Sequence, residues 1–259
     1  VDALEAPVAA AIARGYNDWL AEFCSADPSR LYGAALISLH DPKLAAQEAR
    51  RAVEKLGFRG VFLRPNPVQG RNLHDPANDV FWESVQGLGV PVGFHEGLGP
   101  DLAQVGSDRF QNHLMGHMCS HPMELMMACL SLIAGGVLER FPRLTVAFLE
   151  GNCGWLPWWL WRMDEHYEWL GHLDAPDLTM KPSEYFARQC YISTDCDELP
   201  LRSVIAELGD DRIVFSTDYP HGDSKYPHAV ETFLALPSVS DESKRKILWD
   251  NPARLYGLS

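Results

Sequence analysis

The sequence predicts an α/β protein built around a parallel sheet, and two observations lead to this prediction. Six short apolar runs, rich in β-branched and aromatic residues, alternate with helical segments along the chain. Four of these runs end in a residue that can do chemistry: Arg64, His95, Glu150 and Asp218. Such residues collect at the carboxyl ends of the strands in a (β/α)8 TIM barrel, so we expect that fold, with about six of the eight strand–helix units in this chain.

Length and composition restrict the class of protein. The 259 residues, 46% of them hydrophobic, suffice for a large core, and we expect residues 1–259 to form a single domain. The net charge of -13 disfavours a nucleic-acid partner. No apolar run reaches the roughly 20 residues that span a bilayer, and Asp2 and Glu5 lie where a signal peptide carries basic residues. We therefore expect a cytoplasmic protein whose six cysteines are buried thiols rather than disulfides.

The first half of the chain reads as alternating helices and strands. Large apolar residues recur at helical spacing in the first helix, and we interpret them as core packing: Tyr16, Trp19, Leu20 and Phe23. The expected helices are 1–24, 42–56 and 79–88, and the expected strands are 31–39, 60–63 and 90–94.

The second half continues this alternation after a long connection, residues 97–120. His113 and His117 are four residues apart, which is the spacing of many metal sites, but we favour a mobile loop that covers the substrate. The methionines of the next helix are interpreted as core. The expected helices are 122–140, 155–169, one from about 200, 226–236 and one from 240, and the expected strands are 144–149, 191–194 and 213–215.

The segment 212–227, RIVFSTDYPHGDSKYP, carries the strongest chemical signal. Asp218 follows a short buried strand, and His221 comes three residues later, where Pro and Gly end the strand. A carboxylate with a nearby imidazole at a strand end is a candidate metal ligand or general base. A capping Asp and a solvated His on a loop would give the same pattern.

Three further residues are candidates for the same site. His95 directly follows a strand, so His95 and Asp218 at two strand ends of one sheet make a plausible ligand pair. The planar guanidinium of Arg64 can bind a substrate carboxylate, although a surface ion pair fits equally well. Trp155 is a candidate substrate contact in a tryptophan-rich helix that also suits a core or interface.

Five segments together carry a resemblance to a known family: FRGVFLRPNP (58–67), GVPVGFHEG (89–97), GGVLERFPRLTVAFLEGNCGWLP (135–157), RIVFSTDYPH (212–221) and ILWDNPARLYGL (247–258). They resemble the amidohydrolase-related metal-dependent hydrolases, TIM barrels that include the aminocarboxymuconate-semialdehyde decarboxylase group. Each segment alone is a weak signal, but their order is specific as a set. The resemblance covers nearly the whole chain.

The resemblance implies roles for three residues. The metal-binding Asp of the family's last strand matches Asp218, and the metal-binding His of its fifth strand matches His95. The sixth strand usually supplies a His, but Glu150 lies there, and we expect it to bind metal or act as a base. The family's first strand carries an Asp/Glu-x-His or His-x-His pair that this chain lacks, so we expect about two leading strands to be missing.

The function implied is hydrolysis of an amide, ester or lactone-like bond by water activated on a divalent ion, Zn²⁺, Mn²⁺ or Fe²⁺. Asp218 would accept the water proton, and His121 and His221 are candidate acids or substrate contacts. Non-oxidative decarboxylation of an aromatic or enoic acid on the same metal is the alternative. An inactive barrel that serves as a binding partner is a third. We expect a small carboxylated or aromatic substrate, a homo-oligomer, and neither nucleic acid nor membrane as a partner.

Overall fold

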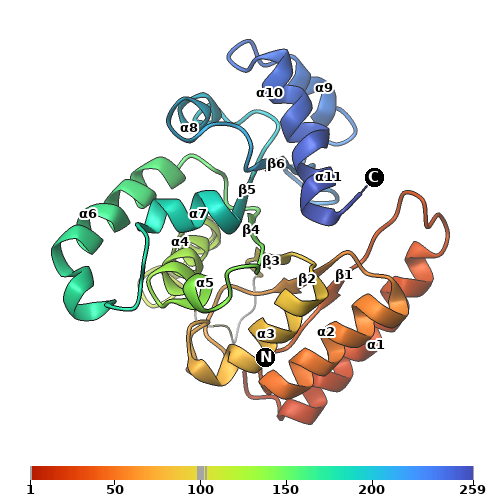
Figure 1. The fold of residues 1–259 in the computed structure, drawn as a ribbon. Helices are drawn as coiled ribbons and strands as arrows, with labels where there is room; N and C mark the ends of the chain where they lie inside the picture. The colour runs from red at the N-terminus through yellow and green to blue at the C-terminus, as the bar shows by residue number, and fades with distance from the viewer. Residues whose placement is uncertain (1, 98–101, 103, 259) are drawn as a thin grey trace.

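The computed structural model of the chain describes residues 2–97, 102 and 104–258. Six parallel strands form one sheet, and each strand pairs with the next one along the chain. The helices follow in sequence order around the outside of this curved sheet (Figure 1). The six predicted strand–helix units are therefore confirmed. The strands are β1 (Ala34–Leu36), β2 (Gly60–Leu63), β3 (Val92–His95), β4 (Val146–Leu149), β5 (Cys190–Thr194) and β6 (Ile213–Phe215).

Local sequence signals determine where several helices begin and end. Asp41 caps the helix that follows β1, because its carboxylate accepts the N–H groups of Lys43 and Leu44. Gly57 ends the same helix at φ 75°, a left-handed conformation that glycine adopts without strain. The helices are α1 (Ala6–Cys24), α2 (Pro42–Leu56), η1 (Pro76–Asn78), α3 (Asp79–Leu88), α4 (His113–Ile133), α5 (Val137–Arg140), α6 (Leu156–Asp174), α7 (Pro182–Gln189), α8 (Leu201–Leu208), α9 (Ala229–Leu234), α10 (Asp241–Arg245), η2 (Lys246–Asp250) and α11 (Asn251–Tyr256).

The register of the strands brings the predicted site residues to one edge of the sheet. His95, the last residue of β3, pairs with Leu149 of β4, so it lies beside the residue that precedes Glu150. The ends of β5 and β6 are paired in the same way, and Asp218 follows β6 by three residues. The carboxyl ends of parallel strands thus place these three side chains at a common edge.

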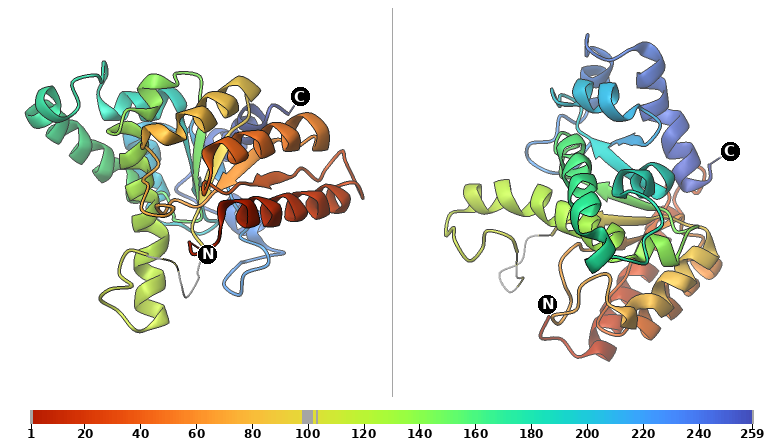
Figure 2. Two further views of the ribbon diagram at one scale, coloured as in Figure 1. Left: turned by 90° about the horizontal axis from the view of Figure 1, so that it is seen from below. Right: turned by 60° about the vertical axis from the view of Figure 1, so that its left-hand side comes forward.

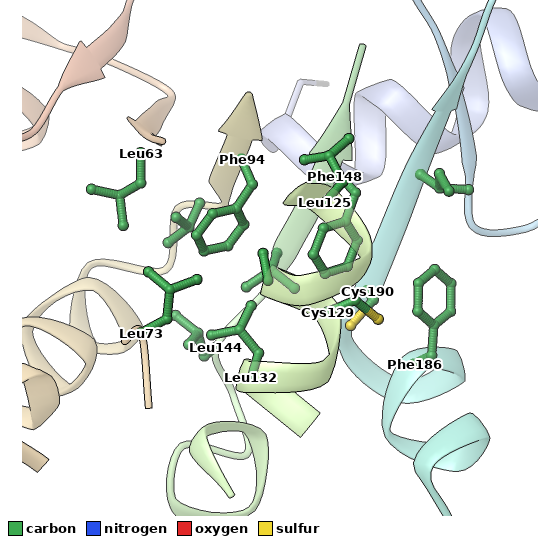
Figure 3. Close-up of a cluster of buried hydrophobic side chains, with 14 of the residues drawn as sticks. Leu63, Leu73, Phe94, Leu125, Cys129, Leu132, Leu144, Phe148, Phe186 and Cys190 are labelled. Carbon is green, nitrogen blue, oxygen red and sulfur yellow. The ribbon is translucent and has the colours of Figure 1, made fainter. Parts of the chain in front are cut away.

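The core lies between the sheet and the outer helices. Phe94 of β3 and Phe148 of β4 stack with ring centroids 5.9 Å apart, and Phe186 of α7 stacks on Phe148 at 6.2 Å. Cys129 of α4 and Cys190 of β5 are fully buried beside them (Figure 3). Both thiols are free, as are the other four cysteines, which confirms the expectation of free thiols. The expected burial is wrong for Cys24 and Cys119, which are partly exposed. This apolar layer fixes the helices against the strands that carry the site.

Helix α1 packs differently from the prediction. Three of the residues interpreted as core are exposed, Tyr16 by 44%, Trp19 by 53% and Phe23 by 55%, and only Leu20 packs against the core. The side facing the sheet is instead made of small residues and Asn17, whose amide exchanges hydrogen bonds with the backbone of β1. The helical spacing of the large apolar residues is confirmed, but the face of α1 that carries them points outward and not into the core.

The segment expected to be a mobile loop is partly helical. Residues 98–101 and 103 lie outside the described residues, but residues 113–120 form the first turns of α4. The sequence predicts a helix start at Pro122, yet Pro122 lies inside α4, where it supplies no backbone N–H to the preceding turn. Met123 and Met127, interpreted as core, are exposed. The loop prediction is therefore wrong for the part of the connection that carries histidines.

None of the helices in the described ranges has the length and apolar character that a membrane crossing requires.

Candidate metal centre

Two carboxylates and an imidazole converge at the carboxyl edge of the sheet. Glu150 follows β4, Asp218 follows β6, and His221 lies in the loop beyond Asp218. The Nδ1 atom of His221 lies 2.7 Å from Asp218 Oδ1 and 3.1 Å from Glu150 Oε1. Among the residues that the structure describes, these three form the group whose ligand atoms all lie within 4.8 Å of one another. Asp218 and His221 thus lie together as the sequence suggested, and Glu150 is the third member of the group.

His95 joins this group from β3. Its Nε2 atom contacts Glu150 Oε2, and its Nδ1 atom lies 2.6 Å from the backbone oxygen of Glu96. A carbonyl oxygen only accepts, so Nδ1 carries the hydrogen and donates it. Once Glu150 is released, a neutral His95 ring presents an unprotonated Nε2, which is the form that binds a metal ion.

The backbone at both carboxylates is unusual. Glu150 has φ 57° and Asp218 has φ 54°, left-handed conformations that are rare in residues with a side chain. Hydroxyl groups support both positions: the N–H of Glu150 donates to Ser193 Oγ at 3.0 Å, and that of Asp218 donates to Ser216 Oγ at 3.2 Å. Such conformations persist where surrounding structure enforces them, often at functional sites.

The electrostatics of the site couple its groups. Burial alone would raise the pKa of Glu150, but the hydrogen bond and charge of His95, followed by the charges of His221 and His121, lower it. Burial would lower the pKa of His95, yet its bond to Glu150 raises it. Burial, followed by the negative charge of Glu150, raises the pKa of Asp218. Of these two carboxylates, Glu150 is therefore the one whose charged form its surroundings favour.

Helix α4 delivers a further histidine to the centre. His121 is buried, and its Nε2 atom lies 3.8 Å from Glu150 Oε1. The helix approaches closely because residue 151 is glycine: a Cβ atom there would lie 2.5 Å from the side chain of Leu125 and 3.2 Å from the backbone oxygen of His121. Burial, followed by the charge of His117, lowers the pKa of His121. Its neutral form is favoured.

This donor set fits a divalent transition metal. Carboxylate and imidazole ligands suit Mn²⁺, Fe²⁺ and Zn²⁺, and the set offers both kinds at one point. The carboxylates of Glu150 and Asp218 also lie close together and repel each other. A divalent cation between them would offset this repulsion. Glu150, Asp218 and His221 are placed to hold such an ion, and His95 can join them by releasing Glu150.

The two predicted substrate-binding residues lie outside this centre. Arg64 ion-pairs with Asp2, and its Nη2 atom also donates to the backbone oxygen of Pro67 at 3.1 Å. It lines a separate cavity of about 150 Å³. The indole N–H of Trp155 donates to Gly151 O at 3.0 Å, and its ring lies against Phe148. Both of these Trp155 contacts are made within the protein and position the start of α6.

The centre opens into a cavity of about 360 Å³. Its walls include residues that sequence reasoning missed, namely Ser193, Tyr219 and Tyr256. Ser193 and Tyr219 were detectable in principle, because one lies in β5 near its carboxyl end and the other directly follows Asp218. Tyr256 comes from α11, and nothing in its local sequence indicates that this helix reaches the site.

A parallel sheet with candidate metal ligands at its carboxyl edge is typical of metal-dependent α/β-barrel enzymes. The amidohydrolase family model matches residues 1–258, and the chain therefore belongs to the amidohydrolase family. This confirms the resemblance and the barrel fold expected from the sequence.

Several relatives of the chain are named as decarboxylases. The chain is 33% identical over 261 residues to a gamma-resorcylate decarboxylase from Rhodococcus jostii, with 95% of this chain and 77% of that protein covered. It is 31% identical over 258 residues to the Polaromonas sp. protein of the same name, covering 95% and 76%. The crystal structure of a dihydroxybenzoic acid decarboxylase from Polaromonas sp., with bound manganese and the inhibitor 2-nitroresorcinol, superposes with a TM-score of 0.84 at 29% identity, covering 99% and 78%.

These comparisons overturn one prediction and confirm another. Hydrolysis, the main function expected from the sequence, is wrong, because the relatives are named as decarboxylases. Decarboxylation was the alternative. The expectation of a divalent metal centre is confirmed by the manganese of the structural neighbour, one of the three metals named from the sequence.

Proposed function

We propose that this protein is a metal-dependent, non-oxidative decarboxylase of a small aromatic carboxylic acid. The observation that carries the proposal is the convergence of Glu150, Asp218 and His221, with His95 beside them, at the strand ends of a chain whose relatives decarboxylate hydroxylated benzoates. The third sequence-based alternative, an inactive binding partner, receives no support from this arrangement.

The metal is proposed to be held by His95, Glu150 and Asp218, with His221 as an additional ligand or a hydrogen-bond partner of the carboxylates. When bound, a divalent ion polarises substrate oxygens and offsets the negative charge of the acid. Among Zn²⁺, Mn²⁺ and Fe²⁺ we propose Mn²⁺, because the structural neighbour binds manganese.

The protein's own side chains would manage the proton. Decarboxylation breaks the bond between ring and carboxylate, leaves the electron pair on the ring carbon, and requires one proton there for each CO₂ released. His121 and His221 are the proposed acids. His121 lies 3.8 Å from Glu150, and because burial lowers its pKa, the ring gives up a proton readily once it is protonated. Asp218, whose pKa is raised by burial, can exchange a proton with His221.

Substrate contacts remain part of the proposal. The Nη1 atom of Arg64 is buried without a hydrogen-bond partner within the described part of the chain, which leaves its two N–H groups for an acidic group. Trp155 stays a candidate from the sequence alone. We further propose a homo-oligomeric, cytoplasmic protein. The exposed aromatic stripe on α1 supports the oligomer.

The test is CO₂ release by purified protein reconstituted with Mn²⁺, Zn²⁺ or Fe²⁺. We expect 2,6-dihydroxybenzoate to yield resorcinol and an equal amount of CO₂, and we expect benzoate, which lacks hydroxyl groups, to react far more slowly. An aryl ester serves as the control for hydrolysis. Failure of a panel of hydroxybenzoates and 5-carboxyvanillate to release CO₂ with any of the metals would contradict the proposal.

A further inference from the structure

Three histidines lie along one face of α4 at intervals of four residues: His113, His117 and His121. The rings of His113 and His117 have centroids 5.5 Å apart, and those of His117 and His121 are stacked at 4.3 Å with an interplanar angle of 23°. Residues four apart are neighbours on a helix surface, so the three imidazoles form a continuous row. We call this row the histidine row.

The histidine row connects solvent with the metal centre. His113 is exposed, His117 is half-buried and His121 is buried. At the inner end, His121 Nε2 faces Glu150 Oε1 across 3.8 Å, while Nδ1 lies 3.2 Å from Ser120 Oγ. At the outer end, the first turns of α4 extend beyond the body of the molecule (Figure 2). Helix α4 thus carries imidazoles from the surface to the site.

The proposed decarboxylation consumes protons, which the histidine row could supply. The inference therefore rests on the proposed function. Each turnover transfers one proton to the ring carbon and releases CO₂, so the acid that donates it must regain a proton before the next turnover. His121 is 8% exposed, so little of its ring is open to water. The histidine row offers it a route for protons from the surface.

We propose that His117, supplied through His113, returns protons to His121 during turnover. Imidazole suits this task because it gains and loses a proton near neutral pH. The rings of His117 and His121 are stacked, and those of His113 and His117 meet edge to face. In the proposed route each transfer passes through a water molecule that bonds to nitrogens of both rings. His117 accepts a proton at one ring nitrogen and gives the proton on its other nitrogen to His121. The net uptake is one proton for each CO₂ released.

Two other roles for the row make different predictions. A purely structural role would mean that stacking positions His121, in which case small diffusible acids cannot replace His117. A second metal site would require ligand atoms that converge, and the group of such atoms found among the described residues does not include the row. Only proton transfer predicts rescue by a soluble imidazole.

The first test compares His117→Ala with the wild-type protein in steady-state decarboxylation. In weakly buffered solution we expect kcat to fall ~10-fold and KM to stay unchanged, because His117 touches no substrate. Imidazole at millimolar concentrations should restore kcat in the variant and not affect the wild type. His113→Ala should show a smaller loss. Met118→Ala on the same helix, and His172→Ala on α6, are the matched controls and should retain full activity.

Unchanged kcat in His117→Ala, or a loss that imidazole does not restore, would overturn the proposal. A second measurement is independent of activity: the rate at which the ring N–H of His121 exchanges with water, followed by NMR of protein with ¹⁵N-labelled histidine and no metal. We expect this exchange to slow several-fold in His117→Ala and not in His172→Ala. Equal rates would overturn the proton route, whereas a wild-type protein inactive on every acid would count against the proposed function instead.

Discussion

Glu150 and Asp218 leave different strands in the same left-handed conformation, and both carboxylates approach the same atom, Nδ1 of His221, at 3.1 Å and 2.7 Å. A left-handed residue with a side chain costs about 1–3 kcal/mol. Two such residues at one point mean that the strand ends are shaped to bring two negative charges together. A cation, whether imidazolium or metal ion, makes that arrangement favourable.

Replacing Glu150 by Gln keeps the shape of the side chain and removes its charge. We expect affinity for Mn²⁺ to fall by ~100-fold, an effect at the upper end of what altered metal-site groups produce. Calorimetric titration with Mn²⁺ measures this, with Glu165→Gln on the exposed side of α6 as the control. Equal affinity in both variants would remove Glu150 from the ligand set.

Asp218→Asn tests the carboxylate at the end of β6. We expect a folded protein, because Asp218 holds its position through its backbone N–H to Ser216, which the substitution keeps. Decarboxylation should fall by ~10²–10⁴-fold, the usual contribution of a proton-transferring group. Circular dichroism checks that the variant is folded, and CO₂ release measures its activity. A variant that merely unfolds would favour a structural role for Asp218.

Arg64 and Asp2 form an informative pair of substitutions. If Arg64 binds the substrate's acid group, Arg64→Met should raise KM with little change in kcat. Asp2→Asn should lower KM, since the carboxylate of Asp2 competes for the same guanidinium. Steady-state kinetics of both variants decides the matter. Unchanged KM in Arg64→Met would leave the ion pair as a purely structural contact.

Asp195 predicts a pH dependence of stability. Burial, followed by the negative charge of Glu198, raises the pKa of Asp195 to about 6. The folded state therefore holds this proton more tightly than the unfolded state, whose pKa is near 3.8. Its contribution to stability is present below pH 4 and is lost as pH rises to about 6.

The variant Asp195→Asn lacks this titration and still accepts the amide of Asn152. We expect its Tm to exceed that of the wild type at pH 7, with the difference shrinking toward pH 4. Thermal unfolding across this range measures the trend. A difference independent of pH would mean that Asp195 titrates normally.

Trp19 tests the proposed oligomer through the exposed stripe of α1. An isolated aromatic on a surface is unremarkable, but Trp19 lies in ring contact with Tyr16 and Phe23. We expect Trp19→Ser to lower the molar mass seen by light scattering to that of a single chain of 29.0 kDa. Trp169→Ser on α6 is the control. A wild-type protein of 29.0 kDa would contradict the oligomer.

The sequence predicted the sheet and the residues at its edge for a physical reason. Short β-rich runs ended by charge, Pro or Gly locate strand ends directly, so β2 and β6 begin and end where expected. His95, Glu150 and Asp218 follow such ends, and parallel pairing brings them together. The contact of His121 with Glu150 could not be predicted, because it depends on how α4 crosses the sheet.

The sequence predicted burial less well than secondary structure. A helical stripe of large apolar residues shows that one face of the helix is apolar. It does not show whether that face packs against the core or is exposed. The stripe on α1 faces outward because small residues and Asn17 allow the opposite face to approach β1. Similarly, Pro122 resembled a helix start because proline suits the first turn of a helix, yet α4 continues through this residue.

The burial of the sulfur atoms divides the cysteines into two chemical groups. Cys129, Cys153, Cys190 and Cys196 are enclosed, and burial raises the pKa of each thiol. Cys24 and Cys119 are partly open to solvent. An alkylating reagent should therefore modify two thiols in the native protein. Because Cys119 lies on α4 between His117 and His121, a fluorophore attached there would report directly on the surroundings of the histidine row.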